Sequence, residues 1–78
     1  MKNYVVELST PDDDVIYVEF DEKGIAEALF ESITVRDDRI PRVSVCHVEN
    51  HVMKEIMRKE TEAWKKSVEI AREEEDNA

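Results

Sequence analysis

Residues 4–20 read YVVELSTPDDDVIYVEF, and this stretch decides the fold of the N-terminal half of the chain. Apolar and polar residues alternate within 4–8 and again within 15–20, as in β-strands that bury one face. The intervening STPDDD favours a turn, because Pro11 fixes its φ angle and aspartate tolerates unusual backbone angles. The pattern predicts an antiparallel hairpin with a loop slightly longer than a tight turn.

A helix and a third strand are predicted next. Asp21 is the expected N-cap and Glu22 the first-turn acid, where the helix dipole favours negative charge. The apolar positions recur at helical spacing: Ile25, Ala26, Ala28, Leu29, Phe30 and Ile33. Residues 42–48 alternate again and predict a third strand. It pairs with the first strand or, as the alternative, with the second.

The C-terminal third predicts one long helix, roughly residues 50–74, with Asn50 as its N-cap. At 100° per residue, its apolar side chains fall within about 160° of arc. They are Val52, Met53, Ile56, Met57, Ala63, Trp64, Val68, Ile70 and Ala71. The predicted fold is therefore α+β in the order ββαβα: one domain over residues 1–78, with two helices on one side of a three-stranded antiparallel sheet. The acidic tail, residues 73–78, is expected to fray.

The charge of the chain is strongly negative and unevenly distributed. The formal net charge is −9, from 20 acidic and 11 basic residues, and residues 1–31 alone carry nine acids against two bases. This balance disfavours direct binding to nucleic acid or an anionic membrane, and favours association with a basic partner. The single cysteine, Cys46, and the lack of a leader-like segment predict a reducing, cytoplasmic setting in a bacterial or phage-infected cell.

The acids of the N-terminal third form the first candidate interaction surface. They are Asp12, Asp13, Asp14, Glu19, Asp21, Glu22, Glu27 and Glu31. Carboxylates two apart in a strand lie about 6.6–7 Å apart, a spacing comparable to a phosphate track. The alternative is structural, because turns and helix N-termini accept acids wherever they occur.

A second candidate surface is apolar. Glu60 and Ser67 interrupt the helical arc, so the distal patch of Trp64, Val68 and Ala71 is expected to leave the core and meet a second copy or another protein. Alternatively, the helix crosses the sheet diagonally and Glu60 reaches solvent at the edge. Val5 and Tyr17 lie on the outer sheet face, either as part of an interface or as ordinary exposed residues.

No catalytic, metal or cofactor signature emerges. Cys46 and His47 point to opposite faces of one strand, so they complete neither a nucleophile–base pair nor a metal site with Glu49 and His51. A single glycine excludes a phosphate-binding glycine loop, and Asp12–Asp14 lack the calcium-loop pattern. We therefore expect a binding protein, with no enzyme activity, metal or cofactor.

In size and charge the chain resembles the small phage and mobile-element proteins that block host defence, such as anti-CRISPR and anti-restriction proteins. Many of those proteins occupy the basic nucleic-acid channel of a nuclease complex. The resemblance implies an acidic inhibitor or adaptor that binds a basic, nucleic-acid-handling protein by carboxylate mimicry. The alternative from the residues is a homodimeric structural or assembly module that uses the C-terminal helix and has no inhibitory role.

Overall fold

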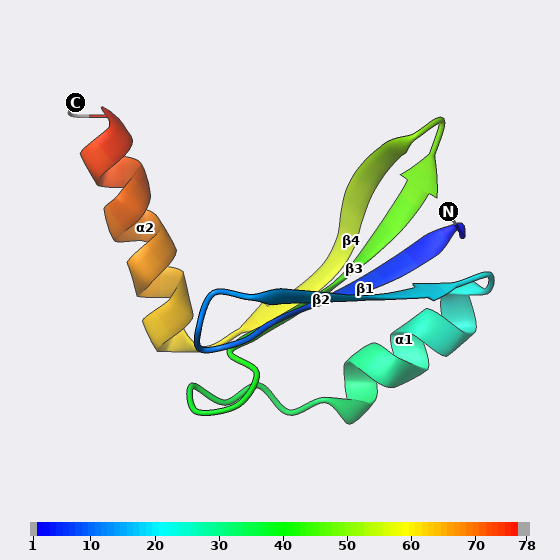
Figure 1. Cartoon of the computed structure of the whole chain (residues 1–78), viewed down its shortest axis with the longest axis horizontal. Coiled ribbons are helices and arrows are strands. Elements are labelled where there is room, and N and C mark those ends of the chain that lie inside the picture. Colours follow the sequence, from blue (N-terminus) through cyan, green and yellow to red (C-terminus); the bar gives the residue numbers. More distant parts are fainter. Residues whose placement is uncertain (1, 77–78) are drawn as a thin grey trace.

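The computed structural model describes residues 2–76, which form a four-stranded antiparallel sheet and two helices. In chain order the elements are β1 (Tyr4–Ser9), β2 (Val15–Phe20), α1 (Lys23–Ser32), β3 (Arg42–Glu49), β4 (Val52–Glu60) and α2 (Glu62–Asp76). The strands are ordered β2-β1-β3-β4 across the sheet, so β2 and β4 are its edges (Figure 1). The prediction of an α+β fold with an antiparallel sheet is confirmed.

The N-terminal hairpin matches its prediction. Strand β1 pairs antiparallel with β2, from Tyr4 opposite Phe20 to Ser9 opposite Val15. Thr10 closes the loop, because its N–H donates to the Asp14 carbonyl oxygen at 2.9 Å and its hydroxyl accepts from the Asp14 N–H at 3.1 Å. Asp13 has a φ of 64°, a left-handed conformation that aspartate tolerates better than most residues.

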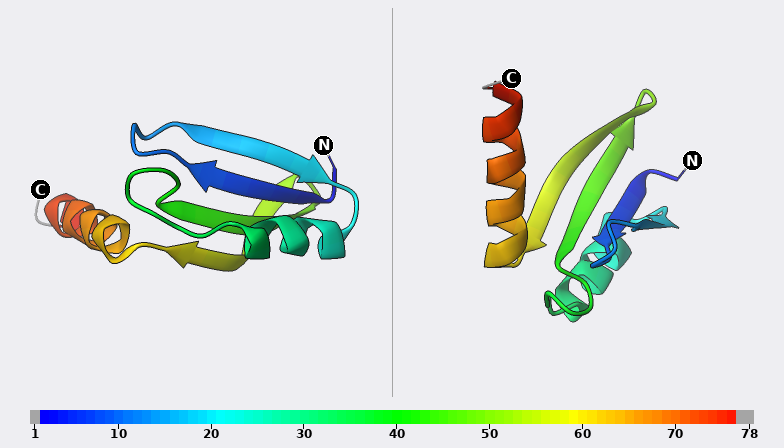
Figure 2. Two further views of the ribbon diagram at one scale, coloured as in Figure 1. Left: turned by 90° about the horizontal axis from the view of Figure 1, so that it is seen from below. Right: turned by 60° about the vertical axis from the view of Figure 1, so that its left-hand side comes forward.

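Helix α1 covers one face of the sheet and forms the core with it (Figures 1 and 2). Ala26 and Phe30 are buried in this core against Val6, Val43 and Val45. Two details of the predicted helix are wrong. The N-cap residue is Glu22 rather than Asp21, without a side-chain cap hydrogen bond, and Ile25 is 51% exposed because the helix turns its Ala26 side toward the sheet.

The segment predicted to start a long helix is instead a fourth strand. Strand β3 pairs with β1, the first of the two placements that the sequence left open, and its other side pairs with β4. A two-residue turn joins β3 to β4, with Asn50 at φ 52° and His51 at φ 66°, as in tight hairpins of the I′ type. The register shifts between Val45 and Cys46, which leaves Ile56 as an extra residue and breaks the alternation that would have revealed a strand.

The C-terminal helix is consequently shorter than predicted and begins at Glu62. Thr61 anchors its first turn: its hydroxyl accepts the Trp64 N–H at 3.2 Å and donates to the Asp37 carboxylate. Its N–H also donates to the Pro41 carbonyl oxygen at 2.9 Å. The expectation that both helices pack on the sheet is wrong, because α2 stands away from it (Figures 1 and 2). Of the acidic tail, residues 73–76 belong to α2, and 77–78 lie outside the described residues.

Candidate binding surfaces

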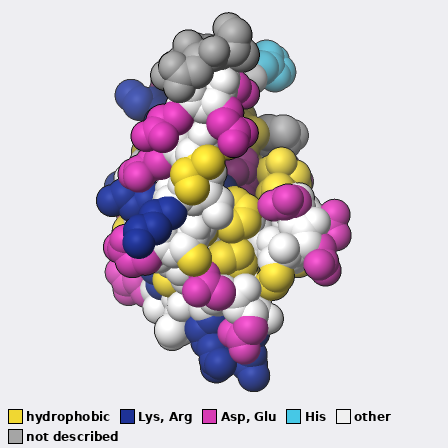
Figure 3. Space-filling model, turned by 90° about the vertical axis from the view of Figure 1, so that its left-hand side faces the viewer, with side chains coloured by type: hydrophobic (Ala, Val, Ile, Leu, Met, Phe, Trp, Pro, Cys, Tyr) yellow, Lys and Arg dark blue, Asp and Glu magenta, His cyan; other side chains and the backbone are white. Residues whose placement is uncertain are grey.

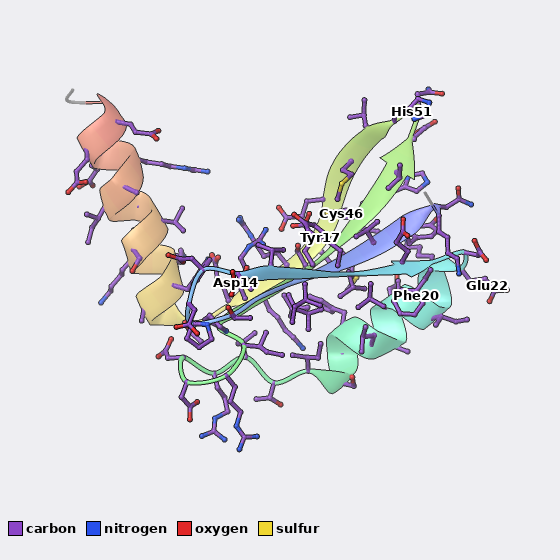
Figure 4. All side chains as sticks on the ribbon, in the orientation of Figure 1. Asp14, Tyr17, Phe20, Glu22, Cys46 and His51 are labelled. Carbon is purple, nitrogen blue, oxygen red and sulfur yellow. The ribbon has the colours of Figure 1, made fainter. Side chains whose placement is uncertain are left out.

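The sheet face opposite α1, which we call the open face, is not covered by either helix within residues 2–76. Tyr17 and Cys46 lie on this side of the sheet, whereas Phe20 points toward α1 (Figure 4). The open face contains a hollow of about 370 Å³ that extends from β2 to β4 and is lined by Val5, Tyr17, Glu19 and Met53. The structure therefore places Val5 and Tyr17, predicted as interface residues, in one shared hollow.

The central strands are buried even on the open face. Val5 is only 2% exposed and Cys46 only 5%, because neighbouring side chains on the outer strands crowd over them. Burial, reinforced by the nearby Glu7 and Glu55 carboxylates, raises the pKa of the Cys46 thiol above its ordinary value. Cys46 is therefore a protonated, inert packing residue near neutral pH.

A cluster of ion pairs lies on the same face toward the α2 end. The Arg42 guanidinium is 3.6 Å from the Glu7 carboxylate and 3.4 Å from that of Glu55, and Arg58 lies 3.6 Å from Glu55. The Arg42 and Glu7 side chains are only 19% and 20% exposed. Sequence reasoning missed this cluster because it placed Glu55 and Arg58 on a helix, whereas cross-strand pairing with β3 brings them to Arg42.

A groove lies between α2 and the adjoining end of the sheet. Trp64, Val68 and Ala71, at i, i+4 and i+7 on α2, line one hollow together with Asp13. A second hollow continues from Trp64 and Val68 onto the open face; its other lining residues are Ser9, Asp13, Val15, Arg42, Arg58 and Glu60. Figure 3 shows apolar side chains gathered between α2 and the hairpin loop. The predicted patch of Trp64, Val68 and Ala71 thus forms one wall of this groove.

The structure divides the eight predicted acids among three places. Asp12–Asp14 lie in the loop before β2, whereas Asp21 and Glu22 follow its other end, as Asp14 and Glu22 show in Figure 4. Glu19 lies between them and accepts the Lys2 backbone N–H at 3.4 Å; the Lys2 amine is 4.0 Å from Asp21. Glu27 and Glu31 sit apart on α1, and Glu27 pairs with Lys23 at 3.5 Å.

The side chains considered as metal ligands do not converge. Cys46 lies on the open face, whereas His47 stacks on Tyr4 with ring centroids 4.9 Å apart. His51 is at the tip of the β3–β4 turn (Figure 4). Across residues 2–76, no three His, Cys, Asp or Glu side chains are grouped as a metal ion requires.

Comparison of the chain with protein-family models, with curated proteins and with solved structures finds no match in any of the three. No helix within the described part of the chain has the length and apolar character needed to cross a membrane. The function therefore has to be argued from the surfaces themselves.

Proposed function

We propose that this chain is a small acidic protein that binds a basic, nucleic-acid-handling protein and acts on it as an inhibitor or adaptor. The observation that carries the proposal is a strip of six exposed carboxylates along the β2 edge of the sheet. The strip consists of Asp12, Asp13, Asp14, Glu19, Asp21 and Glu22. The strip runs from the hairpin loop to Glu22, the N-cap of α1.

The dimensions of the strip suit a nucleic-acid-binding surface. From Asp14 to Asp21 the chain advances seven residues, or about 23 Å along an extended strand. The carboxylates gather at the two ends of that length, so they match two groups of lysine and arginine rather than one. Acids placed there take the positions of phosphates on the partner, as in an anti-CRISPR-like or anti-restriction-like protein of a phage or mobile element.

The hollow between Tyr17 and Glu19 of β2 and Met53 of β4 can hold one basic side chain of the partner. Met53, which is 38% exposed, offers apolar contact for the aliphatic stem of a lysine or arginine. Glu19 and the 59%-exposed Tyr17 ring then offer a carboxylate and an aromatic face for its charged end. This arrangement favours a basic protein over a partner that is only apolar.

The test is affinity capture from a lysate of the native host, with and without nuclease, at low and moderate salt. We expect capture of a basic nucleic-acid-binding complex that withstands nuclease, weakens with salt and is released by added DNA or RNA. Replacing Asp12–Asp14 by asparagine should abolish this capture. Replacing Glu73–Glu75 by glutamine changes the net charge equally and should leave it intact.

Two results would contradict the proposal. If the Asp12–Asp14 replacement leaves capture unchanged, these acids do not bind the partner and serve only turn formation and solubility. Recovery of only the protein's own untagged copies would leave the homodimeric assembly module as the function.

A further inference from the structure

Helix α2 lacks the packing that a helix of its length needs. It has 15 residues, which is at the limit of about 12–15 residues below which isolated helices are marginal in water. None of the buried apolar side chains within residues 2–76 belongs to α2, and Thr61 fixes only its first turn. The radius of gyration of 13.6 Å also exceeds the value of about 11.5 Å for a compact domain of this length.

All the apolar side chains of α2 lie on one side of the helix, within about 160° of arc. They are Ala63, Trp64, Val68, Ile70 and Ala71. Trp64, Val68 and Ala71 follow the four-then-three spacing by which one helix packs against another. Ile70, 55% exposed, lies at the opposite margin of the arc. The arc is therefore wide enough to touch a helix and a sheet at once.

We propose that the groove is the interface with a second copy of this chain, and that each copy inserts its α2 helix into the groove of the other. Each inserted helix packs its Trp64 and Val68 side against the other α2. The Ile70 side of the arc then rests on the open face of the partner copy's sheet. This arrangement covers the exposed apolar surface of both helices in a closed two-fold dimer.

The charge of the groove admits a second copy and does not attract a basic partner. Its charged lining residues, Asp13 and Glu60 against Arg42 and Arg58, are balanced, and the α2 helix that enters carries six acids against three bases. The chain as a whole carries −9, and two copies repel each other across most of their surfaces. Arg42 and Arg58 offset part of this repulsion where the acidic α2 helix enters, whereas a basic protein is drawn to the β2 edge instead.

The area of contact also requires the groove. An α2 helix of 15 residues is about 22 Å long and about 10 Å across, so its lateral surface is about 690 Å². Side-by-side pairing of two helices alone covers a minor part of that surface and falls below the roughly 1,000 Å² that a specific interface needs. Reciprocal insertion covers about half of each helix, about 690 Å² for the two, and about 350 Å² of the two sheets beneath them, which reaches about 1,000 Å² in all.

The test is sedimentation equilibrium of the full chain, combined with amide hydrogen exchange of α2. We expect a mass of twice 9.1 kDa, with α2 amides protected at concentrations where the dimer dominates. Val68→Asp should dissociate the dimer at least tenfold more readily and remove that protection. Ile25→Asp makes the same kind of change at an exposed position of α1, away from the groove, and should leave both properties unchanged.

Because α2 contributes nothing to the core, the sheet and α1 remain folded in Val68→Asp, and their protected amides report this directly. A wild-type monomer at high concentration would overturn the proposal. If α2 were protected in that monomer, the helix would be folding back onto its own sheet. A dimer that survives Val68→Asp would equally overturn it, because the two copies would then meet elsewhere.

Discussion

Replacing His51 by glycine is expected to stabilise the protein. His51 has a φ of 66° in the β3–β4 turn, and a non-glycine residue in this left-handed region is disfavoured by about 1–2 kcal/mol. Glycine removes that strain but has more conformational freedom in the unfolded chain, which costs about 0.5–1 kcal/mol. The net gain is about 0.5–1 kcal/mol, and asparagine followed by glycine is the preferred pair for such a turn.

Thermal unfolding at a fixed protein concentration measures this gain. For a domain of 60–100 residues, 1 kcal/mol shifts the Tm by about 4–8 °C, so His51→Gly should raise it by about 2–8 °C. His51→Ala removes the same exposed side chain without relieving the backbone, and its Tm should stay close to that of the wild type. The comparison therefore separates the backbone effect from the loss of the imidazole.

The sign of the shift decides between two structures for this segment. If Asn50 capped a helix, residue 51 would be its first helical position, and glycine there would lower stability by up to about 1 kcal/mol. A lower Tm for His51→Gly than for His51→Ala would therefore refute the hairpin. It would also remove β4 and the Arg42 ion cluster that depends on it.

Three further changes test the packing. Phe30→Ala should lower the free energy of unfolding by about 3–4 kcal/mol in urea denaturation, because Phe30 is buried under the sheet. Thr61→Ala should lower the helicity of α2 measured by circular dichroism, because loss of the cap destabilises the helix by about 1 kcal/mol. Thr61→Ser retains the capping hydroxyl and should keep the helicity of the wild type. The raised pKa of the Cys46 thiol stabilises the folded state below the ordinary value of 9.0, and this contribution disappears as pH rises above it. Alkylation of Cys46 at pH 8 should accordingly be much slower in the folded protein than in urea, and equal rates would contradict its burial.

The N-terminal hairpin could be predicted from the sequence because its signals are local. Strict alternation on both sides of a proline- and aspartate-rich loop specifies the two strands, and the observed register follows from that loop. Strand β4 could not be predicted in the same way, since its one-residue bulge at Ile56 converts a period of two into a pattern that also fits a helix. Only the pairing with β3, a contact between distant parts of the chain, decides between them.

The sequence contains a local signal for the boundary between β4 and α2, but the apolar pattern of a longer helix outweighed it. Glu60 interrupts the apolar arc, and it is indeed where the regular element ends. Thr61, followed by Glu62, is a helix start of the usual kind, yet Asn50 offered an earlier cap for a longer pattern. The ion cluster was missed for the same reason, because Glu55 reaches both Arg42 and Arg58 only when residues 52–60 are a strand beside β3.

The two proposed interfaces differ in their response to salt, and this difference separates them in one experiment. Association between copies that each carry −9 is opposed by long-range repulsion, which extends about 10 Å at 0.1 M salt and about 3 Å at 1 M. The apolar contacts of α2 are not weakened by this screening, so the dimer should tighten as salt increases.

Capture of a basic partner along the β2 edge relies on attraction between opposite charges and should weaken over the same range. A dimer that dissociates as salt increases would place the acidic strip in the interface between the two copies. A basic partner that stays bound at 1 M salt would place apolar contacts in the interface with that partner. Opposite salt dependences are therefore the result that assigns the groove to self-association and the β2 edge to the partner.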